Sequence, residues 1–323
     1  MKTSQKFTAK LNCINYQTTQ WSIIIFLLLF VSYAGKSNPQ QVKTPSFVLP
    51  EIPAALTASK ERANYLLSHY WDNFDFKDTT YIHLPDITEQ AFVNYIDLLP
   101  HADKQFAAAS IQNLMRKAEK EPTGVVLRYF LTTAESYLYD PNSPMRNEDL
   151  YIPVAQYITL SNSPLLTLAE KAPAEHHLKM MLKNRVGEKA TDFSYTLPSG
   201  KTGRMYAINS EYTLLLFYNP DCHACAETIS ALAASEMLQS LQKNGRLKIL
   251  AFYPDKDLEI WKKKWADIPA EWINSCDKNT TVTDRQLYDL KAIPTIYLLD
   301  RNKTVILKDA DLRQILLPGN FGL

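Results

Sequence analysis

Residues 212–225 read YTLLLFYNPDCHAC, an apolar run followed by a turn and two cysteines. The run from Tyr212 to Tyr218 is bounded by Glu211 and by Asn219-Pro220. A continuous apolar run between turn residues favours a central strand that is covered on both faces. We expect a helix to begin around Cys222, so that the chain passes from a buried strand directly into a helix start at the cysteines.

Cys222 and Cys225 form a Cys-His-Ala-Cys motif at this expected helix start. Free backbone N–H groups and the positive end of the helix dipole favour a thiolate there. Motifs of this kind lower a cysteine pKa from about 8.5 towards about 3.5 to 7.5, which makes the first sulfur a nucleophile near neutral pH. Cys225, one turn further along, is expected to lie deeper and to attack the mixed disulfide that Cys222 forms. We therefore predict that both cysteines are catalytic.

A zinc site and a static disulfide are the other uses of such a pair. Zinc takes four ligands, and the chain offers only Cys276 and scattered histidines to complete the set. A disulfide between adjacent helical turns closes a very small loop and contributes little chain-entropy stabilisation. The spacing therefore favours a redox pair without a bound metal.

The residues on both sides of the motif alternate between strand and helix patterns. The expected strands are 193–197 with a returning strand at 205–208 across the Pro198-Ser199-Gly200 turn, and then 212–218, 247–253, 272–276, 295–299 and 305–307. The expected helices are one from Cys222 to about Lys243 that ends at Gly245, a short one at 258–265, and one at 283–290. This alternation predicts an α/β domain over residues 187–323, with helices on both faces of a central sheet.

Residues 43–186 have a different period. Apolar side chains recur every three or four positions, and the clearest stripe contains Ala91, Phe92, Tyr95, Ile96 and Leu99. Prolines separate the expected helices, which lie near 88–99, 103–120, 125–139, 149–158 and 174–183. The sequence therefore predicts an all-α domain in front of the α/β domain.

Length and charge agree with two ordinary globular domains. The chain has 323 residues, of which 46% are hydrophobic and 21% charged. Its formal net charge is +1. Such a balance gives no long-range field that would gather phosphates, so we do not expect nucleic acid as a partner.

Residues 1–34 have the pattern of an export signal. Lys2, Lys6 and Lys10 precede the apolar run from Ile23 to Val31, and a cut after Ala34 fits the small-residue rule. An uncleaved anchor is the alternative, although the run is shorter than a bilayer-spanning helix. Cleavage leaves three cysteines, and an odd number in an oxidising compartment suits one cycling pair and one spare thiol. We therefore expect the protein in the periplasm or cell envelope.

Two motifs together resemble a known family. Asn219-Pro220-Asp221-Cys222-His223-Ala224-Cys225 after a strand, and Ala292-Ile293-Pro294-Thr295 before a late strand, are similar to thioredoxin-like proteins of the TlpA/ResA type. The approach NRVGEKATDFSYTLPSGK (residues 184–201) resembles the entry strand and turn of the same group. The helical part resembles a domain of unknown function that precedes such modules in envelope proteins of Gram-negative bacteria.

The resemblance implies a thioredoxin fold and a thiol–disulfide oxidoreductase. It implies that Pro294 is cis and lies against the dithiol, and that the backbone of Ile293 pairs with an extended substrate segment; an ordinary trans proline is the alternative. His223 and Ala224 would shape the loop between the cysteines. The implied substrates are disulfide-bearing proteins or small thiols, with no bound cofactor and with a membrane partner that exchanges electrons.

Several positions depart from the family pattern. Asp221 stands where thioredoxins have tryptophan, and Leu216 occupies the position of their buried acid. His223 either stabilises the thiolate as a cation or points to solvent. Glu227 is expected on a solvated helix face, with a role in proton transfer as the alternative. Cys276 is expected to be a buried apolar residue, with a regulatory or resolving role as the alternative.

Two other function classes stay open from sequence. A peroxiredoxin shares the fold, but its threonine three residues before the reactive cysteine is replaced here by Asn219. The other class is a binding protein whose redox motif is secondary. Trp261, Trp265 and Trp272 are expected to form a core stripe, or to offer a docking surface near the dithiol.

Overall fold

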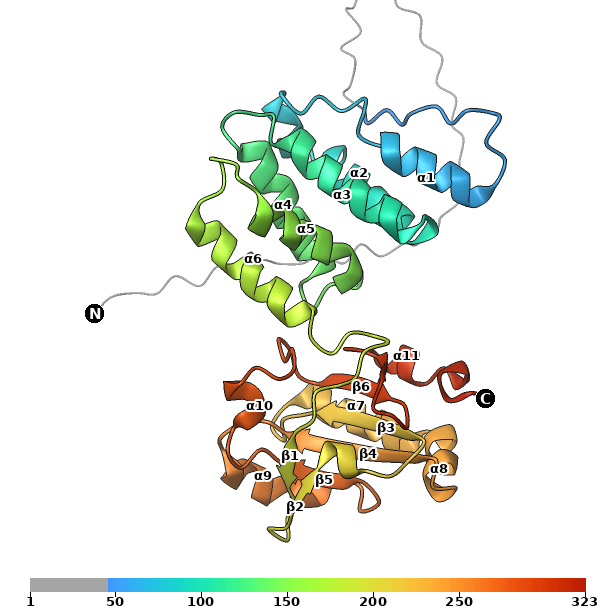
Figure 1. The fold of residues 1–323 in the computed structure, drawn as a ribbon, viewed down its shortest axis with the longest axis vertical. Coiled ribbons are helices and arrows are strands. Elements are labelled where there is room, and N and C mark those ends of the chain that lie inside the picture. Colours follow the sequence, from blue (N-terminus) through green and yellow to red (C-terminus); the bar gives the residue numbers. More distant parts are fainter. Residues whose placement is uncertain (1–45) are drawn as a thin grey trace, which may run out of the picture. The chain divides into compact units, whose positions relative to one another are not determined.

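The computed structural model describes residues 46–323 (Figure 1). The predicted export signal at residues 1–34 lies outside this range and stays a prediction. None of the helices in the described range is both long and apolar enough to cross a membrane.

Residues 46–186, here called the helical half, contain helices and no strand. Its helices are α1 (Ser59–His69), η1 (Thr79–His83), α2 (Thr88–Leu98), η2 (Leu99–His101), α3 (Lys104–Ala118), α4 (Val125–Leu138), α5 (Glu148–Leu160) and α6 (Leu168–Met181). Their core is rich in aromatic rings, and Trp71 packs edge-on against Phe74, Tyr95 and Phe130. Each such ring buries a large apolar area, and edge-on pairs add to its stabilising effect.

The helical stripe predicted at 88–99 is confirmed, because its apolar side chains are all buried. The predicted start of the last helix at Ala174 is wrong, since α6 begins six residues earlier, at Leu168. A capping box between Thr167 and Glu170 satisfies the first N–H groups, and Pro173 is tolerated inside the helix. The helix α1 was not predicted.

The second part, here called the sheet half, contains one seven-stranded sheet. Its strands are β1 (Ser194–Thr196), β2 (Thr202–Arg204), β3 (Tyr212–Phe217), β4 (Leu247–Tyr253), β5 (Ile273–Cys276), β6 (Thr295–Leu299) and β7 (Val305–Leu307). The strand order is β2-β1-β5-β4-β3-β6-β7. Strands β3, β4 and β5 are parallel, and β6 pairs with β3 in the antiparallel sense.

Both faces of the sheet are covered, as the continuous apolar run of β3 predicts. Leu214 and Leu216 enter one core, and Leu215 and Phe217 enter the other. The first core also receives side chains from α7 (His223–Ala234), α8 (Glu236–Lys243), α9 (Leu258–Lys264) and α11 (Leu312–Ile315). The second receives Met205 of η3 (Met205–Ala207) and Val282 of α10 (Thr281–Asp284). Two more single turns, η4 (Trp265–Asp267) and η5 (Pro318–Phe321), complete the fold.

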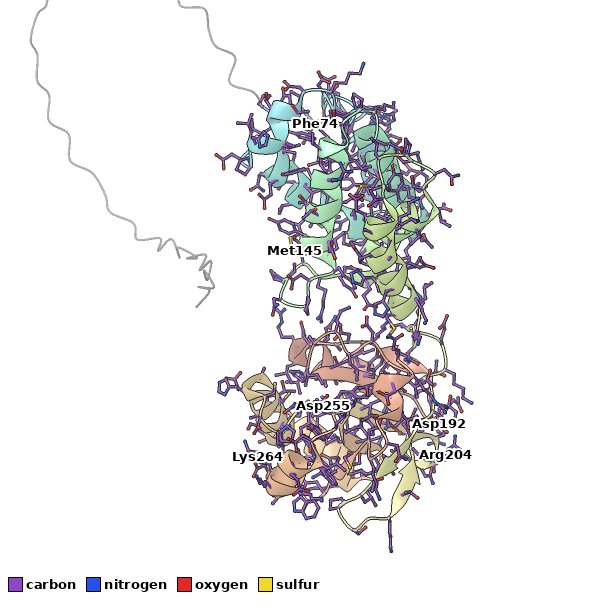
Figure 2. The ribbon with its side chains drawn as sticks, turned by 90° about the vertical axis from the view of Figure 1, so that its left-hand side faces the viewer. Phe74, Met145, Asp192, Arg204, Asp255 and Lys264 are labelled. Carbon is purple, nitrogen blue, oxygen red and sulfur yellow. The ribbon has the colours of Figure 1, made fainter. Side chains whose placement is uncertain are left out.

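The position predicted for the returning strand, residues 205–208, is wrong. The strand is at Thr202–Arg204, and the chain from Met205 to Ala207 forms the η3 turn. The strand that pairs with β1 is β2, and Gly203 lies opposite Tyr195 so closely that a Cβ at Gly203 would clash with the tyrosine ring. Asp192 then holds the chain in the η3 turn, because its carboxylate accepts from Arg204 Nε at 2.9 Å and from Tyr206 N at 3.0 Å (Figure 2).

Two predicted helices are also wrong in extent. The single helix expected from Cys222 to Lys243 is broken at Ser235, whose extended backbone ends α7 and whose hydroxyl accepts from Leu238 N to cap α8. The helix expected at 283–290 is only the single turn α10, because Gln286 takes a left-handed φ of 50°. The predicted end at Gly245 agrees with its φ of 70°.

Candidate dithiol site

Cys222 is the N-cap residue of α7, at the point where β3 has just ended. The backbone N–H of Cys225 donates to Cys222 Sγ at 3.2 Å, so the sulfur occupies the position that a serine or aspartate oxygen takes in an ordinary cap. The side chain is half-buried. Cys222 therefore combines access to solvent with the positive end of a helix.

Cys225, one turn into α7, has no exposed surface. Burial, and then its hydrogen bond with Cys222, hold the pKa of the Cys225 thiol well above its usual range. The backbone N–H of Asn219 donates to Cys225 Sγ at 3.5 Å and acts in the opposite direction. Two cysteines three residues apart are thus an accessible sulfur and a protected one, both present as thiols.

The loop of residues 291–294, here called the cis-proline loop, lies against Cys222. The Ile293–Pro294 bond is cis, as the family resemblance implied. The Cys222 thiol donates to the carbonyl oxygen of Ile293 at 3.6 Å, across 71 positions of sequence. Thr295 Oγ1 donates to the carbonyl of Ala292 at 2.5 Å, which closes the loop at the start of β6.

Polar side chains from two strand ends fix the turn in front of Cys222. Asn219 follows β3 and donates from Nδ2 to Asp255 Oδ2 at 2.9 Å, and Asp255 follows β4. Asp221 N donates to Asn219 Oδ1 at 2.9 Å, and Lys264 Nζ lies 2.8 Å from Asp221 Oδ1. Sequence reasoning missed Asp255 and Lys264. A polar residue after a parallel strand is a signal that could have found Asp255, whereas Lys264 ends α9 and carries no such signal.

The residues between the two cysteines face outward. The His223 side chain is 89% exposed, and its Nε2 lies 3.2 Å from Glu227 Oε1 one turn further along. Ala224 is exposed as well. The solvent-facing alternative for His223 therefore holds in this structure, and Glu227 lies on a solvated helix face as expected. Leu216, at the position of the family's buried acid, is fully buried.

The tryptophans and the third cysteine lie on the neighbouring elements. Trp261 and Trp272 are buried, whereas Trp265 is 36% exposed and packs edge-on against Trp261 at 5.4 Å. Trp265 follows Lys264 directly, so one aromatic side chain of the cluster reaches the surface near the turn of Asp221.

Cys276 is buried at the end of β5, and burial raises its pKa to about 11.

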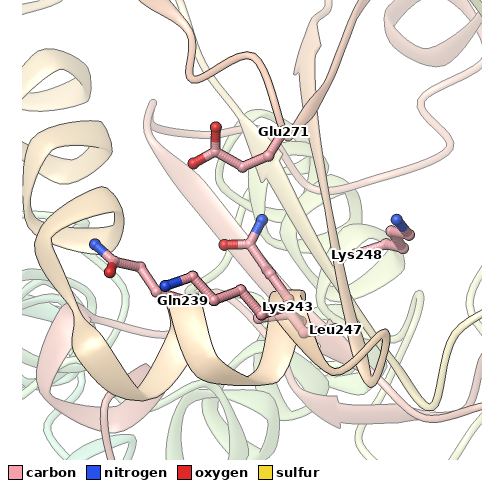
Figure 3. A pocket seen from close by; sticks show the side chains of 6 residues that line it. Gln239, Lys243, Leu247, Lys248 and Glu271 are labelled. Atoms are coloured by element: carbon pink, nitrogen blue, oxygen red, sulfur yellow. The ribbon is translucent and has the colours of Figure 1, made fainter.

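Two hollows lie at opposite ends of the sheet. One of about 250 Å³ adjoins the dithiol turn and is lined by Asn219, Pro220, Ile229, Lys264 and Asp267, among others. The other, of about 370 Å³, lies at the start of β4. Gln239 and Lys243 of α8 line one side of it and Glu271 lines another (Figure 3). Only the first is lined by residues of the turn in front of Cys222, Asn219 and Pro220. Residues 46–323 contain no cluster of three His, Cys, Asp or Glu side chains arranged to hold a metal ion.

Comparison with known proteins finds one family model and several similar solved structures. A family described as "Domain of unknown function (DUF5106)" matches residues 11–184. A thioredoxin-like protein from Bacteroides caccae has a crystal structure similar to this chain, with 46% identity and a TM-score of 0.79. That match covers 84% of this chain and 97% of the other.

Two further solved structures match a smaller part. The C-terminal domain of an uncharacterized protein from Bacteroides fragilis is 51% identical over 41% of this chain and 94% of its own, with a TM-score of 0.40. The thioredoxin domain of a thiol-disulfide oxidoreductase from Bacteroides vulgatus is 18% identical over 41% of this chain and 92% of its own, with a TM-score of 0.36. No protein of curated function matches the chain.

Proposed function

The chain belongs to the DUF5106 family and to the thioredoxin-like proteins, and from this premise we propose that it is a thiol–disulfide oxidoreductase of the periplasm or cell envelope. One observation carries the proposal. Cys222 Sγ is accessible at a helix N-terminus, and Cys225 lies buried directly behind it, with its backbone N–H bonded to that sulfur at 3.2 Å. This arrangement suits a nucleophile and a resolving thiol.

In the first step the accessible sulfur of Cys222 forms a mixed disulfide with the substrate. The Cys222 thiolate attacks one sulfur of a substrate disulfide, forms a mixed disulfide and releases the other substrate sulfur as a thiolate, which takes up a proton. The N–H of Cys225 and the helix dipole stabilise negative charge on Cys222 before the attack. The carbonyl of Ile293, in turn, accepts a hydrogen bond from the protonated form.

The second step depends on the change that the first has made. In the mixed disulfide Cys222 carries neither charge nor proton, so its two contributions that raise the pKa of Cys225 disappear. The N–H of Asn219 still favours the Cys225 thiolate. Cys225 loses its proton, attacks Cys222 Sγ and releases the second substrate thiol, which leaves a Cys222–Cys225 disulfide. Two electrons and two protons pass to the substrate, and an external dithiol reverses both steps.

The cis-proline loop supports the substrate class that we propose, and the export signal is the reason for the proposed compartment. An extended segment beside Cys222 can pair with the backbone of the cis-proline loop, which suits disulfide-bearing proteins as well as small thiols. We propose that a membrane protein supplies or removes the electrons and that the residue 1–34 signal exports the chain. The net charge of +1 gives no reason to add nucleic acid to these partners.

Insulin reduction tests the function. The chain from residue 35 onward should accelerate precipitation of insulin by dithiothreitol, and Cys222→Ser should not. Consumption of hydrogen peroxide, measured in parallel, should stay at the background. Rapid peroxide consumption would indicate a peroxidase instead, and inactivity in both assays with a redox-inert pair would leave the protein as a binding module.

A further inference from the structure

A buried ionic cluster connects α5 of the helical half with the cis-proline loop. Lys291, the first residue of that loop, has a side chain only 11% exposed. Its Nζ lies 2.7 Å from Glu148 Oε1, 3.4 Å from Asp289 Oδ2 and 3.7 Å from Asp309 Oδ2. It also lies 4.6 Å from the centre of the Tyr139 ring. Glu148 is the first residue of α5 and makes the shortest of these contacts.

The remaining members of the cluster fix Glu148 from the other side. Lys308 Nζ lies 2.8 Å from Glu148 Oε2 and donates to the carbonyl of Met181, at the end of α6, at 2.7 Å. Arg146 Nη1 lies 3.4 Å from Asp309 Oδ2. Three carboxylates therefore face three cations. Burial opposes ionisation, yet Lys308 and Lys291 lower the pKa of Glu148, and Glu148 is the main reason that the pKa of Lys291 is raised.

The anchored lysine lies two residues from the carbonyl that contacts the reactive sulfur. Ile293 itself packs between the two cores of the sheet half, and its carbonyl accepts from the Cys222 thiol. The loop is closed at its far end by Thr295 and held at its near end by Lys291. A shift of Lys291 therefore moves the Ile293 carbonyl relative to Cys222 Sγ.

We propose that Glu148 is a positioning residue for the redox pair: through Lys291 it holds the cis-proline loop against Cys222, so that the helical half sets the reactivity of the accessible thiol. The inference rests on the proposed function and adds to it a role for the N-terminal half. The Ile293 carbonyl stabilises the protonated, reduced form of Cys222, because a hydrogen bond to a neutral form disfavours the charged one. Loosening of the loop weakens that bond.

Glu148→Gln, with Asp149→Asn as the matched control, tests the inference in the full chain. Asp149 is the next residue of α5 and also carries a carboxylate, but it pairs with Arg185 and Lys104 instead of the loop. A weak S–H···O bond is worth a factor of about two to five in an equilibrium constant. In Glu148→Gln, iodoacetamide should label Cys222 about two to five times faster at pH 6, and the equilibrium constant for reduction of the pair by glutathione should fall by about the same factor.

Asp149→Asn should match wild type in both measurements. Unchanged values in Glu148→Gln, or equal changes in the two variants, would overturn the inference. If Glu148→Gln does not fold, the same two measurements are made on Glu148→Asp. This variant keeps the charge but is one methylene too short to reach both lysines. A smaller change in the same direction supports the inference, and wild-type labelling overturns it.

A double-mutant cycle tests the route. In a Lys291→Met background, Glu148→Gln should have no further effect on labelling, and an undiminished effect would show that Glu148 does not act through the loop. Labelling and glutathione equilibrium need no protein substrate. Failure of the wild-type chain to reduce insulin therefore refutes the proposed function alone, and wild-type labelling of Glu148→Gln refutes this inference alone.

Discussion

The two ends of strands β3 and β4 differ in how their polar groups are used. At the amino end, Arg246 donates to both carboxylate oxygens of Glu211 at 2.7 and 2.9 Å and to the carbonyl of Phe321 at 3.0 Å. At the carboxyl end, Asn219 and Asp255 pair with each other and leave Cys222 Sγ with only weak hydrogen-bond partners. The same strands thus end in a closed, stabilising contact on one side and in an accessible thiol on the other.

The groups that stabilise the fold and the groups that react therefore lie at opposite ends of the same strands. The amino end buries Phe321 completely, against the ring of Tyr212 at 5.2 Å. The hollow at that end is lined by side chains such as Gln239 and Lys248 (Figure 3). Cys222 and Cys225 follow the other end of β3. Substitutions at the two ends should therefore change different measured quantities.

The largest effect is expected from Cys222→Ser at the carboxyl end. It should reduce insulin reduction to the uncatalysed background, while the free energy of unfolding of the reduced protein changes by no more than about 1 kcal/mol. Cys225→Ser should instead accumulate mixed disulfides with envelope proteins, visible on non-reducing gels. Equal trapping by both variants, or trapping through Cys276, would contradict the assignment of Cys222 as nucleophile.

At the amino end, Phe321→Ala should cost about 4 kcal/mol of unfolding free energy, because a fully buried ring is removed. The rate of insulin reduction per folded molecule should stay unchanged. Leu317→Ala, in the same C-terminal segment but 57% exposed, is the control and should leave both quantities near wild type. Chemical denaturation and the insulin assay measure the two effects. A loss of activity in folded Phe321→Ala would show that the two ends are coupled.

The ionic cluster predicts a pH dependence of stability at the carboxyl end. Lys308 and Lys291 hold the pKa of Glu148 below its ordinary 4.5, so the unfolded chain binds a proton more readily than the folded one. The contribution of Glu148 is therefore fully present above pH 4.5 and is lost as the pH falls through the folded pKa. Glu148→Gln should cost about 3 kcal/mol at pH 7, at the lower limit for a broken buried pair, because Asp289 and Asp309 still face Lys291.

Unfolding curves of wild type and Glu148→Gln between pH 7 and pH 3 measure this prediction. The difference between the two proteins should shrink steadily below pH 4.5. A difference that stays constant over that range would mean that Glu148 is not ionised in the folded chain.

The smallest effect is expected at His223, which lies at the carboxyl end but faces solvent. His223→Ala should change the glutathione equilibrium constant of the pair by less than about twofold, because interactions between exposed charges are screened. Glu227→Gln, its partner variant, should behave in the same way. A tenfold shift in a redox titration of His223→Ala would show that the ring acts on the thiolate in solution.

Local pattern was enough to predict much of this structure. The apolar runs 212–218 and 247–253 locate β3 and β4 because a continuous run between turn residues has few alternatives. That Pro294 lies against the dithiol was implied by the family resemblance of the Cys-His-Ala-Cys and Ile-Pro-Thr motifs, not by local pattern. The extents of α6, α7 and α10 were missed because they depend on single hydrogen bonds and on one left-handed residue, Gln286, rather than on periodicity.

The connections of the site were beyond local pattern. Asn219 and Asp255 are 36 positions apart, and Glu148 and Lys291 are 143 positions apart. All four residues are of polar or charged types that are common on protein surfaces. Their contacts can therefore be recognised only from the fold. The family resemblance implied that the cis-proline loop lies against the dithiol, but it did not predict that the Ile293 carbonyl accepts from the Cys222 thiol.

The exposure of Trp265 has a practical consequence for spectroscopy. Trp71, Trp261 and Trp272 are buried, so among the tryptophans of residues 46–323 only Trp265 is accessible to a collisional quencher such as acrylamide. Its neighbour Lys264 pairs with Asp221, the residue that precedes Cys222. We expect closure of the disulfide to alter this turn, and the quenchable emission should change with it. Turnover can then be followed continuously by fluorescence, with the protein serving as its own optical reporter of oxidation state.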